Sequence, residues 1–530
     1  MIEQNCNHLN CNHNIYENNN CIFHCEKNLE NSWLVAQDGI KNISEKIIYF
    51  WQEFEKYYKD LVFLEDMQVP YYDAELSGRF LPDLRKFEEL DFRNCTFVDE
   101  FTLHNKYNKI SMKIISFNNC NFLDEMFINN LELGYFSIIH SKFKTNPAFK
   151  NISLSSGAEI CNLTSLENNE ILINLNTIKA NNNQFEIWKI DDKNISFNIS
   201  SCEFENLHIY QLKCKELKLT DTKLNKLKIN ALESNRIHLK NVDFSENSRV
   251  VFENINCNNF VIDNISQESK YIQFNHILVR DYFLIRKVEF HNTYFNELDI
   301  SKAIKIIDKV SFANSKLSFI NWGEVKEIKA SRDFFRELKF VYDENHNYIE
   351  ANKFYSIEMK KFKDELIEKD KDGNFFEKNF NNFQDKIIFY IGEKLSNFSQ
   401  SWILPLLWIF TFTLSIFILQ EIIKNSSFFK VFILFILFIF SWIIYNCIFE
   451  KNEDNKFDIY QHIFLIFAML VYIVCFSSIE SVLHFFHIQS YSDYQKINQN
   501  SIFALWFFHK LMLSFIVYQF VIALRRQTRR

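Results

Sequence analysis

Glycine and proline are scarce in this sequence, with only seven glycines and four prolines in 530 residues. These two residues supply many of the sharp turns and flexible connections in proteins, so their scarcity leaves little room for flexible linkers. A chain of this length is too long for one hydrophobic core, and two or more domains are therefore expected.

Motifs for catalysis are also absent. The sequence has no phosphate-binding glycine loop, no G-x-S-x-G elbow, no paired catalytic carboxylates in a recognisable frame and no catalytic Cys/His signature. These absences argue against an enzyme. The formal net charge is −7, so no surface basic enough to follow a phosphate backbone is expected, and a nucleic-acid partner is disfavoured.

A secretory signal is not expected either, because residues 1–31 are polar throughout. The sequence contains twelve cysteines, and free thiols survive best in a reducing compartment. Those in the central region, several of them at small inward positions, are interpreted as core residues. They are Cys95, Cys120, Cys161, Cys202, Cys214 and Cys257.

The sequence does contain a repeat, between Phe87 and Trp322. Large apolar residues recur at every fifth position in short sets, a period that belongs neither to a helix nor to an ordinary strand. The sets are Phe87, Phe92 and Phe97; Met112, Phe117, Phe122 and Phe127; Leu219, Leu224 and Ile229; Phe290, Phe295 and Ile300; and Phe312, Leu317 and Trp322. A small or polar residue also precedes an apolar one by two positions about once in twenty residues. Four faces of five residues would make one coil, and a dozen or so coils would stack into a rod on the order of 55 Å long.

The triads FRNCTF (92–97) and FNNCNF (117–122) resemble the pentapeptide-repeat family. The resemblance implies a right-handed quadrilateral β-solenoid over residues 87–325, in which each inward residue stacks on its equivalent one coil away. A leucine-rich-repeat horseshoe is the alternative, since LKLTDTKL (217–224) also fits its strand pattern. The coil is favoured because a horseshoe does not require five-residue triads.

Helices are predicted at both ends of the repeat. Residues 31–86 are interpreted as an N-terminal helical cap and linker, with a helix from Ser44 to Leu64 that has Ser44 as its N-cap and Trp51 in its apolar stripe. Residues 326–400 are interpreted as a helical hairpin and a linker. Caps are expected because the uncovered end of a solenoid is a sheet edge that promotes aggregation.

Residues 1–30 hold a constellation typical of a metal site. Cys6, Cys11, Cys21 and His24 have the spacing C-x4-C-x9-C-x2-H, which can place four donors around one tetrahedral zinc ion. Such a zinc knuckle would be structural, because a site with four protein ligands has no open position for substrate. A disordered Asn-rich tail is the alternative. Spare donors are Cys25, His8 and His13.

Long apolar stretches follow at residues 401–423, 428–449, 458–479 and 501–524. Each can cross about 30 Å of hydrocarbon, so residues 401–530 are predicted to be an all-α bundle of about four transmembrane helices in the lipid bilayer. By the positive-inside rule, the basic residues after the last span place the solenoid and the C-terminus in the cytoplasm, and the resemblance to the pentapeptide-repeat family implies a bacterial inner membrane. These residues are Arg525, Arg526, Arg529 and Arg530.

Polar residues near the third and fourth spans form a candidate intramembrane site, because the predicted topology brings them to the same outer side. Ionisable groups inside a membrane are costly. A pairing of Lys510 with Glu480 or a loop carboxylate is therefore one interpretation, and separate contacts with the membrane interface are the other. The residues of this candidate site are Glu480, His484, His487, His509 and Lys510.

The helical hairpin carries a second resemblance, to the bridge that joins pentapeptide repeats to a membrane module, often a channel-like pore, in one bacterial subfamily. Its carriers are Arg336, Leu338, Lys339, Glu350, Ala351, Phe354, Tyr355, Glu358 and Met359. A conventional potassium filter needs a glycine-containing loop, and no glycine follows Gly392. A standard potassium-selective pore is therefore not expected, and a degenerate or non-selective pore in a homo-oligomer stays open.

Together these features favour a non-enzymatic bacterial inner-membrane protein that holds a cytoplasmic β-solenoid as an interaction or sensing surface for protein partners. The first alternative is an oligomeric ion channel or membrane-perturbing effector gated by the solenoid. The second is a DNA mimic that binds a topoisomerase, which the family resemblance implies for some members. That mimic is disfavoured because the outward positions mix lysine with glutamate.

Overall fold

The computed structural model describes most of the central repeat and parts of both ends. The described residues are 16, 21–23, 25–27, 44–58, 61–73, 81–104, 110–267, 271–313, 315–317, 320–324, 328–368, 379–399, 401–424 and 503–528, with a few single residues between 463 and 470. The chain divides into two compact units, Met1–Glu337 and Leu338–Arg530.

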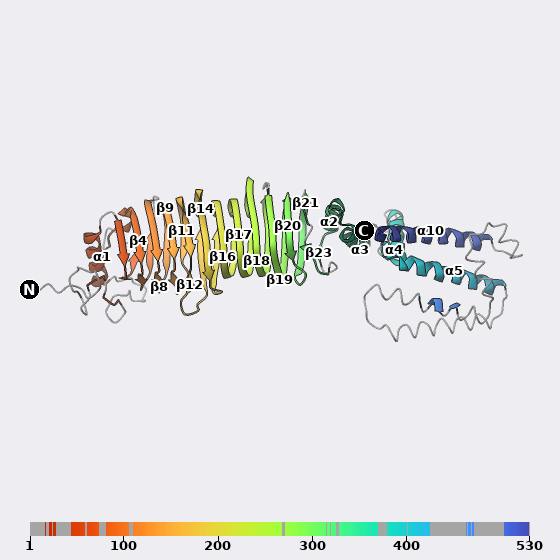
Figure 1. Ribbon diagram of the computed structural model, residues 1–530, viewed down its shortest axis with the longest axis horizontal. Helices are drawn as coiled ribbons and strands as arrows, with labels where there is room; N and C mark the ends of the chain where they lie inside the picture. The colour runs from red at the N-terminus through yellow and green to blue at the C-terminus, as the bar shows by residue number, and fades with distance from the viewer. Residues whose placement is uncertain are drawn as a thin grey trace, which may run out of the picture. The chain divides into compact units, whose positions relative to one another are not determined.

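The first unit is a β-solenoid of about ten turns over residues 89–330. Figure 1 shows its strands side by side along the length of this unit, and every pairing between them is parallel. The strands from the first turn onward are β4 (Glu89–Arg93), β5 (Thr96–Phe97), β6 (Phe101–His104), β7 (Ile110–Asn118), β8 (Asn121–Phe122), β9 (Met126–Ile139), β10 (Lys142–Phe143), β11 (Ala148–Cys161), β12 (Thr164–Ser165), β13 (Ile171–Asn176), β14 (Lys179–Asp191), β15 (Ile195–Ser200), β16 (Glu203–Thr220), β17 (Lys223–Lys240), β18 (Asp243–Gln267), β19 (Tyr271–His291), β20 (Thr293–Asp299), β21 (Ile304–Ala313), β22 (Ile320–Asn321) and β23 (Lys329–Ala330).

Inward side chains confirm the five-residue period. Across β17 the buried positions are separated alternately by two and three residues, so each stretch of five contributes two side chains to the core. Such pairs on successive sides fit a coil rather than a horseshoe, whose repeats set a helical segment opposite each strand. The buried pairs are Thr222 and Leu224, Leu227 and Ile229, Leu232 and Ser234, Ile237 and Leu239, and Val242 and Phe244.

The predicted coil length of twenty residues is too short for most turns, because the average is about 22. Ile209 pairs with Ile229, twenty residues later, but Ile187 pairs with Ile209 after 22 residues. The longest interval between these partners is 27 residues, from Ile160 to Ile187. That turn contains the exposed residues 167–170, which leave the coil and return to it. Extra residues at a corner lengthen a turn without changing its inward side chains.

Asparagine takes the place that glycine has in many turns. A left-handed backbone conformation is required at corners of the coil, and asparagine tolerates it better than most residues. Asn119 donates from its side chain to Asn94 at 2.7 Å, and Asn264 does the same to Asn241 at 2.7 Å, so corner amides also link neighbouring turns. All four of these residues have a φ near +50°. This use of asparagine explains how a solenoid forms in a chain with seven glycines.

Phenylalanines stack on one another through the core. The rings of Phe252 and Phe274 lie 4.9 Å apart with an angle of 9° between them, and Phe274 and Phe295 lie 4.8 Å apart at 4°. These distances match the spacing of about 4.8 Å between paired strands, so the rings of these three turns stack directly on one another. The six cysteines of the repeat are free and buried, as predicted.

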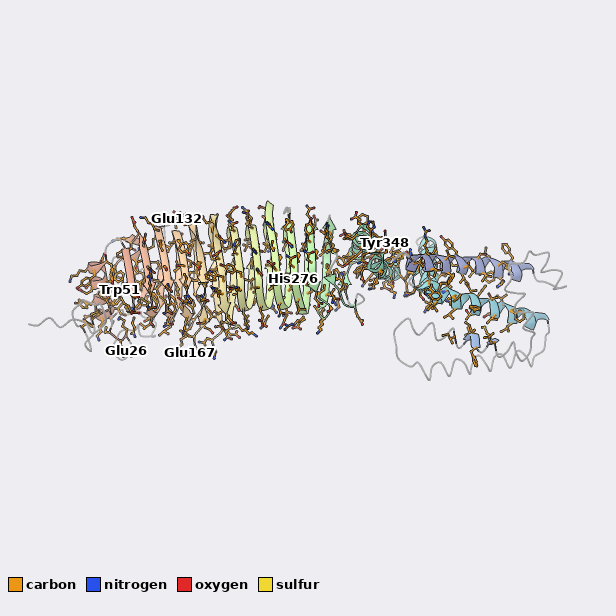
Figure 2. The ribbon with its side chains drawn as sticks, viewed as in Figure 1. Glu26, Trp51, Glu132, Glu167, His276 and Tyr348 are labelled. Atoms are coloured by element: carbon orange, nitrogen blue, oxygen red, sulfur yellow. The ribbon has the colours of Figure 1, made fainter. Side chains whose placement is uncertain are left out.

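The N-terminal end is closed by α1 (Glu45–Tyr57), which begins where predicted because the Ser44 hydroxyl accepts a hydrogen bond from the Ile47 amide at 3.3 Å. Trp51, labelled in Figure 2, is fully buried and donates from Nε1 to the Tyr71 carbonyl at 2.9 Å. The helix stops before Leu64, because residues 61–65 pair with β4 instead. The short elements before the first turn are β1 (Leu61–Glu65), β2 (Gln68–Val69), β3 (Tyr72–Asp73) and the 3₁₀ helix η2 (Leu84–Lys86).

The other end of the solenoid is covered by the first turns of α2 (Arg332–Glu344). Phe334 packs against Phe312 and Trp322, with ring centroids 6.0 and 6.3 Å away. The Glu337 carboxylate accepts a hydrogen bond from the Phe312 amide at 3.1 Å. The predicted helical hairpin is present: α2 is followed by α3 (Tyr348–Glu368), and the rings of Tyr342 and Phe354 stack 5.3 Å apart.

The second unit continues with α4 (Asn379–Ser396), α5 (Ile403–Lys424) and α10 (Phe503–Thr528). Within the described part of the chain, Phe507–Arg526 is the one stretch long and apolar enough to cross a membrane, and Ile403–Leu419 is a shorter apolar helix. The predicted spans 428–449 and 458–479 lie outside the described residues, apart from single positions between 463 and 470. The prediction of four spans therefore rests on the sequence.

Candidate functional sites

The predicted zinc knuckle is described at only one of its four ligands. Cys21 is fully buried, whereas Cys6, Cys11 and His24 lie outside the described residues. Cys25, a spare donor, lies close to Cys21, because its amide donates a 2.9 Å hydrogen bond to the Cys21 carbonyl and closes a turn. Among the residues that the structure describes, no group of three or more metal-binding side chains comes together. Zinc thus stays a prediction, with Cys21 as its one described ligand and Cys25 as a described spare donor.

The segment around these cysteines packs against α1. Phe23 is fully buried and meets the ring of Phe50 edge to face at 5.4 Å. Lys27 is also buried, and its ammonium donates to the carbonyls of Phe23 at 3.2 Å and Cys25 at 3.0 Å. Burial lowers the Lys27 pKa to about 8, against the opposing effect of the nearby thiols Cys25 and Cys21. Residues 21–23 and 25–27 therefore form part of the N-terminal cap.

The candidate intramembrane site is described only on α10. Glu480, His484 and His487 lie outside the described residues, whereas His509 and Lys510 lie near the start of the stretch that can cross a membrane. His509 is fully buried and stacks on Phe412 of α5, with ring centroids 5.9 Å apart and an angle of 12°. The structure therefore places His509 between two apolar helices. The pairing of Glu480 with Lys510 stays a prediction.

The start of α5 and the end of α10 lie side by side. Arg526 donates from its guanidinium to the Phe398 carbonyl at 3.1 Å, and its charge lies 4.4 Å above the ring of Tyr355. Asn352 donates to the Arg526 carbonyl at 3.5 Å. Trp402, just before α5, meets Phe520 of α10 at 6.4 Å. Helix α5 therefore begins on the side of the second unit where α10 ends.

Apolar side chains are exposed along α10. The stretch Phe507–Arg526 has a mean hydropathy of 1.7, and only 22% of it is buried. A core helix of a soluble domain would hide such a surface, and large exposed apolar surfaces mark protein or membrane contacts. The exposed apolar residues of α10 are Phe507, Phe508, Leu511, Phe515, Val517, Tyr518, Val521 and Leu524.

On the outside of the solenoid, three ladders of charged residues alternate in sign from turn to turn. Lys179 pairs with Glu203 at 3.4 Å, and the next two residues in register are Lys223 and Asp243. Opposite charges on paired strands stabilise a sheet and like charges destabilise it, so these ladders help to fix how each turn sits on the next. Two further ladders alternate in the same way: Asp191, Lys213 and Glu233, and Lys240, Asp263, Arg286 and Asp308.

One outward face of the solenoid carries a row of half-buried aromatic rings. We call it the aromatic face, and it is formed by residues 135–139, 157–161, 184–188, 206–210, 226–230, 249–253, 271–275 and 294–296. Trp188 and Tyr210 stack 5.7 Å apart at 13°. Glu159 accepts hydrogen bonds from Tyr135 at 3.0 Å and Trp188 at 2.8 Å. Burial and the Glu159 carboxylate raise the pKa of Tyr135.

Sequence reasoning missed this face, because its members are far apart in the chain and only the register of the turns aligns them. Comparison of the chain with protein-family models, curated protein sequences and solved structures returned no match. The fold and the surfaces described above are therefore the basis for a functional assignment.

Proposed function

We propose that this chain is a non-enzymatic bacterial inner-membrane protein that holds a β-solenoid at the membrane as an interaction or sensing surface. The observation that carries this proposal is the exposed apolar surface of α10, in the same chain as a solenoid that is capped at both ends. Capped ends prevent growth of the sheet by edge pairing, so the long outward faces are the surfaces left for partners. The five-residue period supports a right-handed quadrilateral coil of the pentapeptide-repeat kind.

The contact of Arg526 with Phe398 supports one feature of the membrane topology. It sets the start of α5 beside the end of α10, so the chain between them returns to the side from which it left, whatever path residues 425–502 take. This contact supports an even number of crossings, with the solenoid and the C-terminus on the same side. Arg525 and Arg526 then favour the cytoplasm as that side.

Membrane insertion is tested by alkaline carbonate extraction of membranes that contain the full-length protein. The wild type is expected to stay in the pellet. Replacing Val517 and Val521, exposed on one side of α10, with lysine is expected to shift the protein towards the supernatant, since a lysine at the centre of a span costs about 2.5 to 3.5 kcal/mol. Lysines at Phe340 and Ile349, which are exposed on α2 and α3, are the matched control and should change nothing. Release of the wild type by carbonate would contradict the proposal.

A further inference from the structure

Like charges face each other at two places on the aromatic face: Glu159 lies opposite Glu186 in register, and basic residues lie opposite one another further along the rod. Lys226 lies directly opposite Arg249 in register on the next turn, and Lys228 lies directly opposite His208 on the previous turn. We call these four residues the basic patch. Paired strands are about 4.8 Å apart, so like charges face each other here, whereas the three ladders described above place opposite charges together. Such an arrangement costs stability, and departures from a local rule are expected at functional sites.

The cations of the patch are available to a ligand. Lys226, Lys228 and Arg249 are exposed, and among the ion pairs between described residues none includes them. His208 is half-buried beside them: burial lowers its pKa, and the charges of Lys228 and Lys226 lower it further, while Glu186 acts in the opposite direction. Glu186 lies opposite His208 in register and offsets charge at that end of the patch, whereas Lys226, Lys228 and Arg249 form an exposed positive surface.

Aromatic side chains border the patch on both sides along the rod. Trp188 lies on the turn before the patch and stacks on Tyr210, which lies on the same turn as His208. On the turn after it, the guanidinium of Arg249 lies 5.5 Å from the ring of Tyr271, which in turn contacts Tyr294 at 5.3 Å. Tryptophan, tyrosine and arginine are the residues that most often dominate the energy of protein–protein interfaces. The surroundings of the patch therefore resemble the centre of such an interface.

The charges around the patch limit what can bind there. Glu159 and Glu186 lie on the turns before it, and Glu253 lies on the same turn as Arg249. A long polyanion that follows the rod would meet these carboxylates, which disfavours a nucleic-acid backbone. A short acidic segment would meet only the cations. Lys226 and Lys228 point the same way from one strand, about 6.8 Å apart, which is the spacing of alternate carboxylates in an extended peptide.

We propose that the basic patch, formed by His208, Lys226, Lys228 and Arg249, binds an extended acidic segment of a partner protein. This inference rests on the proposed function, because it assigns a place and a chemistry to the interaction surface. Arg249 can hold one carboxylate through two parallel hydrogen bonds. The two lysines contact carboxylates at alternate positions, and the neighbouring rings pack against the apolar parts of the same segment.

The test measures the binding of a fluorescein-labelled hexaglutamate peptide to the full-length protein in nanodiscs, by fluorescence anisotropy at low salt. The wild type should bind it, and the triple variant K226E/K228E/R249E should bind at least tenfold more weakly. The matched control, K150E/K287E/K309E, changes the same number of exposed cations elsewhere on the rod and should bind as the wild type does. Circular dichroism melts of all three proteins confirm that each is folded.

Three outcomes would overturn the inference. No binding by the folded wild type is the first, and equal loss in the test and control variants, which indicates general charge attraction, is the second. Tighter binding of labelled hexathymidylate than of hexaglutamate is the third, since it assigns the patch to nucleic acid.

Carbonate extraction of the same proteins keeps the two proposals separate. Patch-dependent binding by a protein that carbonate releases would overturn only the membrane proposal, and membrane-inserted protein without such binding would overturn only this inference.

Discussion

Arg526 lies with its guanidinium 4.4 Å above the ring of Tyr355 and donates to the carbonyl of Phe398. The last residue of the stretch that is long and apolar enough to cross a membrane is thereby joined to α3 and to the turn before α5. In that turn Asn397, Phe398 and Ser399 are all left-handed, a conformation that non-glycine residues adopt at a cost. Contacts such as those of Arg526 stabilise the turn and hold the two apolar helices together at one end.

Replacing Arg526 with alanine is expected to loosen the end of α10. The loss of a cation–π contact and a charge-assisted hydrogen bond should cost about 2 kcal/mol. Hydrogen exchange measured by mass spectrometry on protein in nanodiscs should therefore increase at residues 520–528 and at the turn before α5. Arg525→Ala is the control, because Arg525 is exposed and should leave exchange unchanged. Equal exchange in the two variants would show that Arg526 does not hold this end.

Reversing one charge in a ladder is expected to destabilise the solenoid. Lys213 lies 3.5 Å from Asp191 and 3.7 Å from Glu233, so Lys213→Glu places three carboxylates in a row. We expect a loss of about 1 kcal/mol in the free energy of unfolding, smaller at high salt because these groups are partly exposed. The triple variant D191K/K213E/E233K restores alternation with the signs exchanged and should recover most of this loss. Urea unfolding curves measure the free energy of unfolding of each variant. A triple variant no more stable than Lys213→Glu would contradict the role of alternation.

Removing one ring from the phenylalanine stack is expected to have a larger effect. Phe274 lies between Phe252 and Phe295 in the core, and Phe274→Ala should cost about 3 to 5 kcal/mol, because it removes buried contacts and leaves a cavity. Tyr294→Ala on the outside is the control and should cost about 1 kcal/mol or less. Because each turn contacts only its neighbours, hydrogen exchange should rise most in residues 252–295. An equal rise in hydrogen exchange along the whole rod would argue against turns that are stabilised only by their neighbours.

The inward thiols are expected to make stability depend on pH under alkaline conditions. Burial raises the pKa of Cys202, Cys214 and Cys257 to about 12, from an ordinary value of 9.0. Between these two values the unfolded chain releases protons that the folded chain retains, so their contribution is fully present below pH 9 and falls as the pH rises towards 12. A variant with alanine at all three positions should show a shallower decline in unfolding free energy over this range.

The same burial predicts slow alkylation. In native protein at pH 8 these three thiols should react with iodoacetamide far more slowly than in urea, because the thiolate is the reactive form and is almost absent. Mass spectrometry identifies the modified positions. Rapid native modification of Cys202, Cys214 or Cys257 would show that the solenoid opens often enough to expose them.

Local signals in the sequence were sufficient for much of the fold. The five-residue period predicted the solenoid because inward residues repeat whatever the length of a corner, and Ser44 predicted the start of α1 because its hydroxyl accepts from Ile47. The coil length was wrong because corner insertions such as residues 167–170 have no apolar pattern. The strand at residues 61–65 was missed because its partner, β4, begins 28 residues after it.

The surfaces were harder to predict than the fold. Lys226 and Arg249 are neighbours only because Leu227 pairs with Val250 in register, and the shift in register between the two strands cannot be counted from a fixed repeat of twenty. The exposed apolar surface of α10 could be predicted, because length and hydropathy suffice for a helix that crosses a membrane. The contact between Arg526 and Phe398 could not, since it joins residues 128 positions apart.

The most direct test of a solenoid anchored in the inner membrane is protease digestion of the full-length protein in inside-out membrane vesicles. The C-terminal helices should be protected by the bilayer, and peptides from the caps and corners of residues 1–366 should appear in the supernatant. Mass spectrometry of both fractions measures this division. Recovery of residues 507–526 as soluble peptides from intact vesicles, or protection of the solenoid until the vesicles are opened, would contradict the account.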